Sequence, residues 1–439
     1  MRKYYIILLI GVLFSNCESI LDVEITDSID GNEMVITNLN RAELGMTGLY
    51  DELQSGLSFT MTLSDLQTDD IVYKGFSPSA ALIDANKVPA DYFFLNLMWY
   101  SFYGDIKQAN ILCEDLPMAK DIPTETSNRM QGEALFLRAF AYFNLVNNWG
   151  PVPLLITAVR TSEDIENMAN DSVDKIFTQI EADLLEADTK LGDYAEQGRA
   201  SSMAAKALLS RVYLYQEKWQ QAYDYANAVI ESGQYSLLEN YEEIFDHNNP
   251  YSSESIFEID FDEEQSNALS FWYYPTDLGG RYLYGVSDDL VNAFDTLDKR
   301  FDASIGLSDA SGYYVKKYNE IANSSDNIIV IRLAEMYLTR AEALLNGASP
   351  NGADTRLEDF NKTYTRAGLG PHPGPVTTDD ILNERRFEFA FEMHRWYDLT
   401  RTGEAINVLE NVISTNQYLW PIPQAEIDVN PFIEQNQGY

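Results

Sequence analysis

Cysteine and histidine are scarce in this chain of 439 residues, which holds two cysteines and three histidines. The histidines, His247, His372 and His394, are widely spaced, and the sequence contains no HxxxH or CxxC motif, which excludes a zinc site of the usual spacing. GxSxG, Walker and GxGxxG patterns are also missing. Their absence removes the common signals of a serine hydrolase, a P-loop nucleotide site and a dinucleotide site.

Basic residues are few. Lysine and arginine number 30 against 69 acidic residues, which gives a formal net charge of −39. A field of this sign repels nucleic acid, anionic lipid head groups and polyanionic substrates. The composition therefore excludes nucleic-acid binding and favours a neutral ligand. Aromatic residues make up 13% of the chain, too many for a disordered acidic segment.

Long hydrophobic runs are also lacking, except for one at the N-terminus. Arg2 and Lys3 precede an apolar stretch at 4–14, which Ser15-Asn16-Cys17 ends. A basic segment followed by a short apolar run is typical of a secretory signal peptide, here 1–16. A membrane-spanning helix would need about 20 apolar residues. The alternative is a buried N-terminal strand.

Cys17 follows the apolar run directly and resembles the lipobox cysteine of bacterial lipoproteins, which is acylated after cleavage. Several acyl chains, such as palmitate, provide stable membrane anchoring. With Cys17 acylated, Cys113 is the only thiol left, so no disulfide framework forms and the fold depends on its core. Residues 17–36 are polar and show no periodic pattern of apolar residues, and we interpret them as a lipidated tether.

In the remainder of the chain, apolar residues recur mainly with the periodicity of an α-helix, which predicts a predominantly helical structure. Helical runs are predicted at 38–53, 95–116, 128–147, 172–190, 201–216, 219–232, 328–346, 353–367 and 379–402. Short β-like runs occur at 253–260 and 313–318. The pattern predicts a mainly α fold in three parts: an N-terminal helical half (37–232), an inserted loop and strand region (233–327) and a C-terminal helical half (328–439).

Two helical runs carry an internal repeat. Ser210, Tyr213 and Ala222 fall at the spacing of a tetratricopeptide helix pair, in which small residues allow close helix contact. The segment RLAEMYLTRAEAL (332–344) repeats the first half of this signature. An ordinary helical hairpin is the alternative interpretation. Strands and loops inserted between such repeats are often the binding face.

The stretch FWYYPTDLGGRYLYG (271–285) is the main candidate for a ligand site. On a strand, successive side chains alternate between faces, so four consecutive aromatics cannot all enter one core. Tyrosine and tryptophan present a large apolar area with a polar tip, which suits the apolar face and the hydroxyls of a sugar ring. An aromatic core is the alternative. The predicted site residues are Trp272, Tyr273, Tyr274, Arg281, Tyr282 and Tyr284. A similar aromatic, loop-like stretch runs over 69–94.

Carboxylates at 384–398 raise an enzymatic alternative. Glu384, Glu388 and Glu392 lie four residues apart on one helical face, and paired carboxylates are what a glycosidase needs. The structural interpretation, which we prefer, is an ion-pair network in which Arg385 reaches Glu388 and Arg395 reaches Glu392 and Asp398 at three-residue spacing. Asp69–Asp70 could contribute to a structural Ca²⁺ site, although we prefer a solvated turn as the interpretation of two adjacent acids. No other cofactor is indicated.

Several long segments resemble the SusD/RagB family of outer-membrane nutrient-uptake lipoproteins. These segments are GEALFLRAFAYFNLVNNWGPVPLL (132–155), RLAEMYLTRAEAL (332–344), ERRFEFAFEMHRWYDLTRTG (384–403) and LWPIPQAEIDVNP (419–431). Trp149, Trp396 and Trp420 lie inside these motifs, so we interpret them as packing residues.

The resemblance implies a SusD-like fold, in which tetratricopeptide-like helix pairs support an irregular loop and short-strand ligand region. It also implies a non-catalytic, cell-surface lipoprotein of a Gram-negative outer membrane. Such a protein captures oligosaccharides for a SusC-like TonB-dependent transporter. The family also has a second ligand loop in the N-terminal region. The matching region of this chain, assigned by its place in the sequence, contains Asp69, Asp70, Tyr73, Lys74 and Phe76. The alternatives are a peptide-capturing member of the family, a protein-binding repeat scaffold and, as a different class, a glycoside hydrolase.

Overall fold

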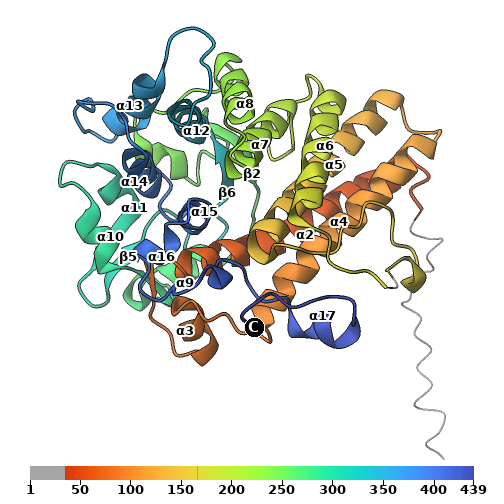
Figure 1. Cartoon of the computed structure of the whole chain (residues 1–439), viewed down its shortest axis with the longest axis horizontal. Coiled ribbons are helices and arrows are strands. Elements are labelled where there is room, and N and C mark those ends of the chain that lie inside the picture. Colours follow the sequence, from red (N-terminus) through yellow and green to blue (C-terminus); the bar gives the residue numbers. More distant parts are fainter. Residues whose placement is uncertain (1–34, 166) are drawn as a thin grey trace, which may run out of the picture.

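The computed structural model describes residues 35–165 and 167–439 (Figure 1). The predicted signal peptide, Cys17 and nearly all of the predicted tether lie outside the described residues. Among the helices that are described, none combines the length and apolar character needed to cross a membrane.

Eight long helices form the frame of the molecule. They are α2 (Leu39–Leu66), α4 (Phe93–Asp115), α5 (Thr124–Trp149), α6 (Val173–Leu191), α7 (Ser202–Tyr215), α8 (Trp219–Glu231), α12 (Leu333–Leu345) and α13 (Arg356–Arg366). In this order, each helix packs against the next, which gives the curved array seen in Figure 1. Serine and asparagine side chains accept backbone N–H groups at the first turns of α2, α6 and α7, as helix N-caps do. The predicted mainly α class is confirmed.

The predicted tetratricopeptide pair is α7 with α8. The Ser210 hydroxyl donates a hydrogen bond of 3.0 Å to the carbonyl of Ala222, and the rings of Tyr213 and Tyr225 stack with centroids 5.5 Å apart. Helix α12 then packs on α8, and α13 on α12. The small residues at 210 and 222 therefore allow close contact of the helices, as their spacing predicts.

Short elements fill the space beside this frame. The helices are α3 (Pro78–Asp84), α9 (Leu269–Tyr273), α10 (Asp288–Ala293), α11 (Arg300–Ser304), α14 (Thr378–Glu388), α15 (Arg395–Arg401), α16 (Ala405–Val408) and α17 (Gln424–Val429). The strands are β1 (Ile71–Tyr73), β2 (Ser255–Ile259), β3 (Tyr284–Val286), β4 (Ile305–Ser308), β5 (Gly312–Val315) and β6 (Ile328–Arg332). The strands pair antiparallel as β1–β3, β2–β6 and β4–β5.

Two predicted helices differ from the structure. The run 328–346 begins as strand β6, because its first residues pair with β2. The run 379–402 is broken after Glu388, and the chain turns before α15 begins at Arg395. Phe391 and Met393 adopt positive φ values of 65° at this turn, a conformation that side chains other than glycine adopt only when packing enforces it. The side chains of Phe391 and Met393 both pack on the main core, which supplies that constraint.

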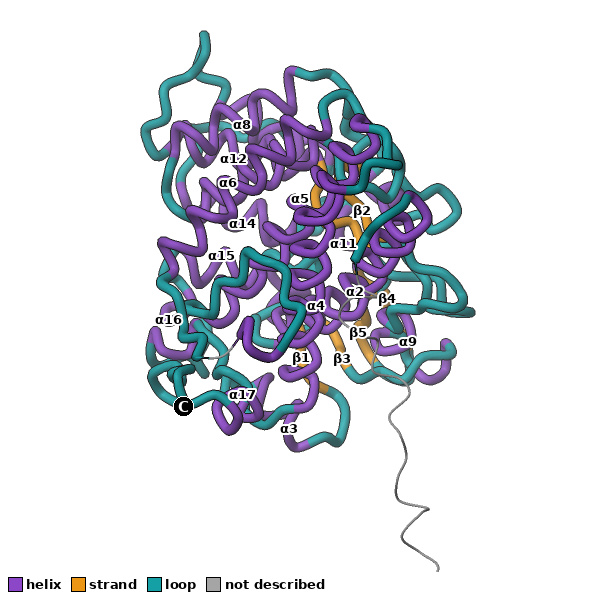
Figure 2. The backbone as a smooth tube through the Cα atoms, turned by 90° about the vertical axis from the view of Figure 1, so that its right-hand side faces the viewer, coloured by secondary structure: helices purple, strands orange, loops and turns teal. Residues whose placement is uncertain are grey.

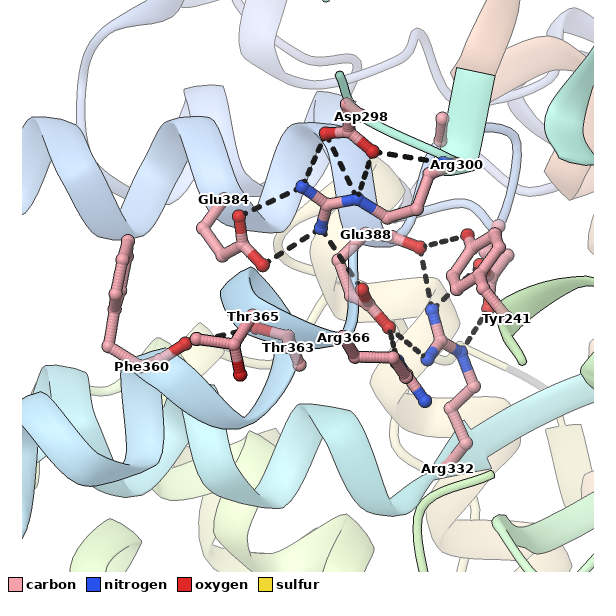
Figure 3. Close-up of polar contacts among 12 residues, drawn as sticks. Tyr241, Asp298, Arg300, Arg332, Phe360, Thr363, Thr365, Arg366, Glu384 and Glu388 are labelled. Atoms are coloured by element: carbon pink, nitrogen blue, oxygen red, sulfur yellow. Dashed lines mark hydrogen bonds and ion pairs between the residues drawn. The ribbon is translucent and has the colours of Figure 1, made fainter. Parts of the chain in front are cut away.

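A buried network of charges surrounds this turn (Figure 3). The guanidinium of Arg332 lies 2.6 Å from Glu388 and 2.7 Å from Glu392, and it also reaches Glu254 at 2.8 Å. Arg300 contacts Glu384 at 2.8 Å, and none of these side chains is more than a few per cent exposed. The remaining members are Asp298, Lys317 and Arg366.

The network explains the protonation of its members. Burial alone would raise the pKa of Glu388, but the guanidinium groups of Arg366, Arg332 and Arg300 hold that pKa far below its usual range. Burial lowers the pKa of Lys317 to about 8, although Glu392 opposes this shift. The carboxylates of 384–392 are thus enclosed and neutralised. They form the ion-pair network predicted in preference to a glycosidase pair.

The predicted partners within this network were wrong. Arg385 pairs with Asp398 at 2.7 Å rather than with Glu388. Arg395 pairs with Asp69 at 2.7 Å rather than with Glu392 or Asp398. The break after α14 separates Arg395 from Glu392, whereas Arg385 and Glu388 lie in the same helix and each pairs with residues outside it.

Asp69 and Asp70 connect the end of α2 to the C-terminal half. Arg395 contacts Asp69 through both Nε and Nη2, at 2.8 and 2.7 Å, and Arg386 contacts Asp70 at 2.7 Å. Burial would raise the pKa of Asp69, but Arg395 and Arg386 hold it below its usual value. This Asp69–Arg395 and Asp70–Arg386 clamp fixes the start of β1.

The prediction that three tryptophans are packing residues is confirmed. Trp149, Trp396 and Trp420 are all at most 1% exposed. The ring of Trp149 packs edge-on against those of Trp99 and Trp420, with centroids 5.4 and 5.2 Å apart. The Trp149 indole N–H donates to the carbonyl of Pro421 at 2.9 Å, and the Trp420 indole N–H donates to Gln67 at 2.5 Å. The segment around residue 420 is therefore inserted among α2, α4 and α5.

Replacing Arg332 with methionine should lower the free energy of unfolding by about 3–5 kcal/mol, because Glu254, Glu388 and Glu392 would lose a buried cation. Urea unfolding followed by circular dichroism measures the change. Arg356→Met is the matched control, since Arg356 pairs with Asp354 on the surface, where a pair contributes about 1 kcal/mol or less. Equal, small effects of both substitutions would contradict a stabilising network.

Asp69→Asn should destabilise the fold by about 1–3 kcal/mol at pH 7, because Arg395 and Arg386 lose a charged partner. The pKa of Asp69 lies lower in the folded protein than its unfolded value of about 3.9, so its contribution is present above that pH and is lost as the pH falls. The difference in the free energy of unfolding between Asp69→Asn and the parent protein should therefore become smaller below about pH 4. Urea titrations at several pH values test this. Asp91→Asn, at an exposed position, should change little.

Candidate functional site

Strands β1 and β3 bring the two predicted ligand loops together, although about 200 residues separate them in the sequence. Tyr73 lies opposite Tyr284, and Ile71 lies opposite Val286. The backbone N–H of Lys74 continues the pairing by donating to the carbonyl of Leu283 at 2.8 Å. Helices α3 and α9 flank this small sheet, and Figure 2 shows all four elements at the same end of the molecule. We call this end the β1–β3 face.

The stretch 271–274 forms helix α9 and its exit rather than the predicted strand. Ala268, with φ of 59°, precedes the helix, and the Asn267 side chain accepts the N–H of Leu269. The chain then turns at 275–280 and returns. On its return, the N–H groups of Arg281, Tyr282 and Leu283 donate to the carbonyls of Phe271, Tyr274 and Trp272 respectively. The argument from strand alternation therefore does not apply here.

Two of the predicted site residues are part of the core. Tyr273 is 1% exposed, and its ring stacks with that of Tyr318 at a centroid distance of 6.1 Å. Tyr284 is 8% exposed and lies against Tyr73, Trp272 and Tyr273. Burial raises the pKa of both phenols. For Tyr273 and Tyr284, the aromatic-core alternative describes the structure better than a ligand contact.

Exposed rings nevertheless gather on the β1–β3 face. Phe76 is 100% exposed in the loop before α3, and Phe271 is 39% exposed on α9. Trp272 is half-buried beside Phe59, whose ring stacks on Phe94 with centroids 4.6 Å apart. Next to this stack, Phe93 is 67% exposed. The face thus combines aromatic surface from four separate segments of the chain.

Phe59, Phe93 and Phe94 are absent from the predicted set of site residues. The aromatic density of 69–94 was a usable signal for Phe93 and Phe94. Phe59 lies within α2, where the helical period gives no indication that one ring extends to the surface. Only the tertiary packing of α2 against α9 places Phe59 beside Trp272.

The other predicted residues have defined positions. The hydroxyl of Tyr73 accepts the N–H of Ser77 at 2.8 Å, and the ring of Tyr274 packs on Tyr314. The hydroxyl of Tyr282 donates to the carbonyl of Tyr313 at 3.0 Å. Lys74 and Arg281 are exposed. Asp69 and Asp70 are held by the arginine clamp, so their charges are already compensated within the protein.

The structure gives no further support for a metal site. Within residues 35–165 and 167–439, no three or more histidine, cysteine or acidic side chains are grouped so as to hold a metal ion. The carboxylates of Asp69 and Asp70 point to arginines instead.

Two larger cavities lie away from the predicted site residues. One, of about 520 Å³, is polar and lies between β2, the segment 244–250 and the loop 317–327. The other, of about 500 Å³, is largely apolar and lies between α4, the segment 153–168 and the segment 426–433. None of the predicted site residues lines either of these two cavities.

Two family profiles match separate parts of this chain. A profile described as "Starch-binding associating with outer membrane" matches residues 27–214, and one described as "SusD family" matches residues 302–411. A SusD-like protein of Formosa agariphila is 27% identical over 503 aligned positions, which cover 99% of this chain and 98% of the relative. The starch-binding protein SusD of Bacteroides thetaiotaomicron is 25% identical, covering 76% of this chain and 77% of its own.

Solved structures agree with these matches. A structure described as a laminarin-binding SusD-like protein superposes with a TM-score of 0.82 at 28% identity, covering 92% of this chain and 100% of its own. A surface glycan-binding protein of Bacteroides thetaiotaomicron, solved with laminarihexaose, has a TM-score of 0.80 at 22% identity, a likeness of fold alone. The helix array, the paired loops and the matches over both halves lead to one conclusion: the chain belongs to the SusD/RagB family and has a SusD-like fold.

Proposed function

We propose that this protein binds oligosaccharides on the β1–β3 face and delivers them to a SusC-like TonB-dependent transporter of the outer membrane, without catalysing a reaction. The observation that carries the proposal is the gathering of exposed and half-buried rings from four segments, with Phe76 wholly exposed. Relatives described as starch-binding and laminarin-binding support the ligand class.

Flat rings suit this task for a physical reason. A sugar ring presents C–H groups on its faces and hydroxyls at its edge, so an aromatic side chain contacts the apolar face while water and polar groups serve the hydroxyls. The rings are held before a ligand arrives: Phe59, Phe94 and Trp272 pack on one another, and the β1–β3 pairing fixes the loop that carries Phe76. Such preorganisation reduces the entropy lost on binding.

The non-catalytic part of the proposal rests on the acidic residues. The carboxylates of 384–392, which are the candidates for glycosidase chemistry, are buried and paired with arginines and Lys317. A glycosidase needs two carboxyl groups that are accessible to the scissile bond from a substrate site. The exposed rings, by contrast, lie at the surface of the β1–β3 face.

Replacing Phe76 with alanine should weaken oligosaccharide binding about 2- to 12-fold, the loss expected for about 0.5–1.5 kcal/mol of aromatic stacking. Trp272→Ala should weaken binding at least as much, since it also removes the support of Phe59. A glycan array first identifies which of laminarihexaose and the malto-oligosaccharides bind. Isothermal titration with those ligands then measures the change in affinity. Phe76→Ala should leave the unfolding midpoint unchanged because its side chain is fully exposed.

Phe432→Ala is the matched control, because Phe432 is an exposed ring on a different segment and should not affect binding. Normal affinity of Phe76→Ala and Trp272→Ala for every bound glycan would disprove the site. An array without glycan hits, together with co-purifying peptides, would favour the peptide-capturing alternative. Shortening of the oligosaccharide during the titration would contradict the absence of catalysis.

The proposed lipid anchor depends on Cys17. Cys17→Ala should abolish incorporation of labelled palmitate and release the protein from the outer-membrane fraction of the cells that express it. Cys113→Ala is the control and should retain both label and membrane association, since burial raises the pKa of the Cys113 thiol to about 12 and makes it a poor nucleophile. Label that remains after the Cys17 substitution would contradict lipidation at this residue.

A further inference from the structure

One arginine differs from nearly all others in this protein. Leaving Arg41 aside, each described arginine except Arg281 has a carboxylate oxygen within ion-pair distance. The Arg281 side chain pairs with none of the carboxylates in the described part of the chain, and it is exposed. In a protein with 69 acidic and 30 basic residues, an uncompensated guanidinium on the surface is unusual.

Arg281 lies on the β1–β3 face itself. Its backbone N–H donates to the carbonyl of Phe271 at 2.6 Å, so the two residues are neighbours across the turn at 275–280. Lys74, a second exposed cation, is bonded through its backbone to Leu283, two residues further along the same segment. Burial raises the pKa of Asp84, and Lys74 lies close enough to oppose this rise, so part of the Lys74 charge is compensated.

The backbone around Arg281 is held firmly. A side chain in place of Gly280 would meet the carbonyl oxygen of Tyr274 at 2.1 Å, which restricts this turn to glycine. The next residue, Tyr282, has a φ of 52°, a left-handed conformation that costs a tyrosine free energy. Its hydroxyl bond to Tyr313 and the backbone bonds to Tyr274 maintain this conformation. The segment is thus fixed in a strained form that presents Arg281 beside the rings.

We propose that Arg281 selects glycans that carry an anionic group, a carboxylate or a sulfate ester, next to the sugar that stacks on the aromatic side chains. This inference rests on the proposed function and changes its ligand class from neutral to acidic. A guanidinium binds a carboxylate or sulfate through two parallel N–H···O bonds, which gives both strength and orientation.

The large negative charge of the protein does not prevent this recognition. At an ionic strength of 0.15 M, charges more than about 8 Å apart are largely screened, so the groups nearest to the ligand determine its local interaction. The overall field disfavours long polyanions, whereas a short oligosaccharide that places one anionic group on Arg281 gains a direct pair. Binding of the acidic glycan should therefore weaken as salt is added, while binding of a neutral analogue should not.

Two matched pairs of probes test the proposal by isothermal titration at 0.15 M salt. The first is a short oligogalacturonate and its methyl ester, in which a neutral ester replaces each carboxylate. The second is a sulfated galactan oligosaccharide and its desulfated form. We expect the acidic member of at least one pair to bind about tenfold more tightly than its neutral partner. The pair that shows this preference identifies the anionic group.

Arg281→Gln should remove the preference, so that the acidic and neutral members of the pair bind with similar affinity. Arg281→Lys should restore part of it, because a lysine keeps the charge but loses the paired donors. Arg356→Gln, which removes the same charge at a remote surface position, should keep the full preference and so controls for the overall field.

The outcomes separate this inference from the proposed function. Neutral members that bind as tightly as the acidic ones, or a preference that survives Arg281→Gln, would overturn the inference while glycan binding stands. If no probe binds and a glycan array is also empty, the proposed function fails and the inference fails with it.

Discussion

The fold depends on compensating the charge of carboxylates that are buried near the middle of the molecule. Glu384, Glu388 and Glu392 come from one segment of the chain, and burial without cations would cost several kcal/mol for each charge. Arg300, Arg332 and Arg366 supply those cations from three other elements, α11, β6 and α13. These elements meet at the turn after α14, so the network connects the C-terminal helical half to the inserted region 233–327. A hydrophobic core of similar volume would fill the space but would not impose this register.

The pairing of arginines with carboxylates also affects the charge of the surface. Because most arginines are paired inside the protein or at the clamp of Asp69 and Asp70, the exterior is dominated by acidic groups. The clamp also fixes the start of β1, and β1 positions the loop with Phe76 against the segment that carries Phe271 and Arg281. Internal electrostatics and the ligand surface are therefore connected through a few residues at the end of α2.

The sequence predicts some of these features and not others, for physical reasons. Helical period and the small residues Ser210 and Ala222 are local properties, so the helix array and the α7–α8 pair could be inferred from them. Partners of charged residues are not local: Arg395 reaches Asp69 across 326 positions, and spacing along one helix could not indicate this. The aromatic stretch 271–274 was recognisable as unusual, but its fold as a short helix, with Tyr273 in the core, is decided by tertiary packing with Tyr318. Phe59 could not be found for the same reason.

The insertion of the segment around residue 420 between α2, α4 and α5 affects the order in which the protein can form. The Trp149 indole N–H donates to the carbonyl of Pro421, the Gln67 side-chain oxygen accepts from the Trp420 indole N–H, and Trp149 also packs on the Trp420 ring. The first half of the chain therefore cannot complete its core while the ribosome is still making the second half. The tryptophan cluster is therefore among the last parts of the core to be completed as the chain is made.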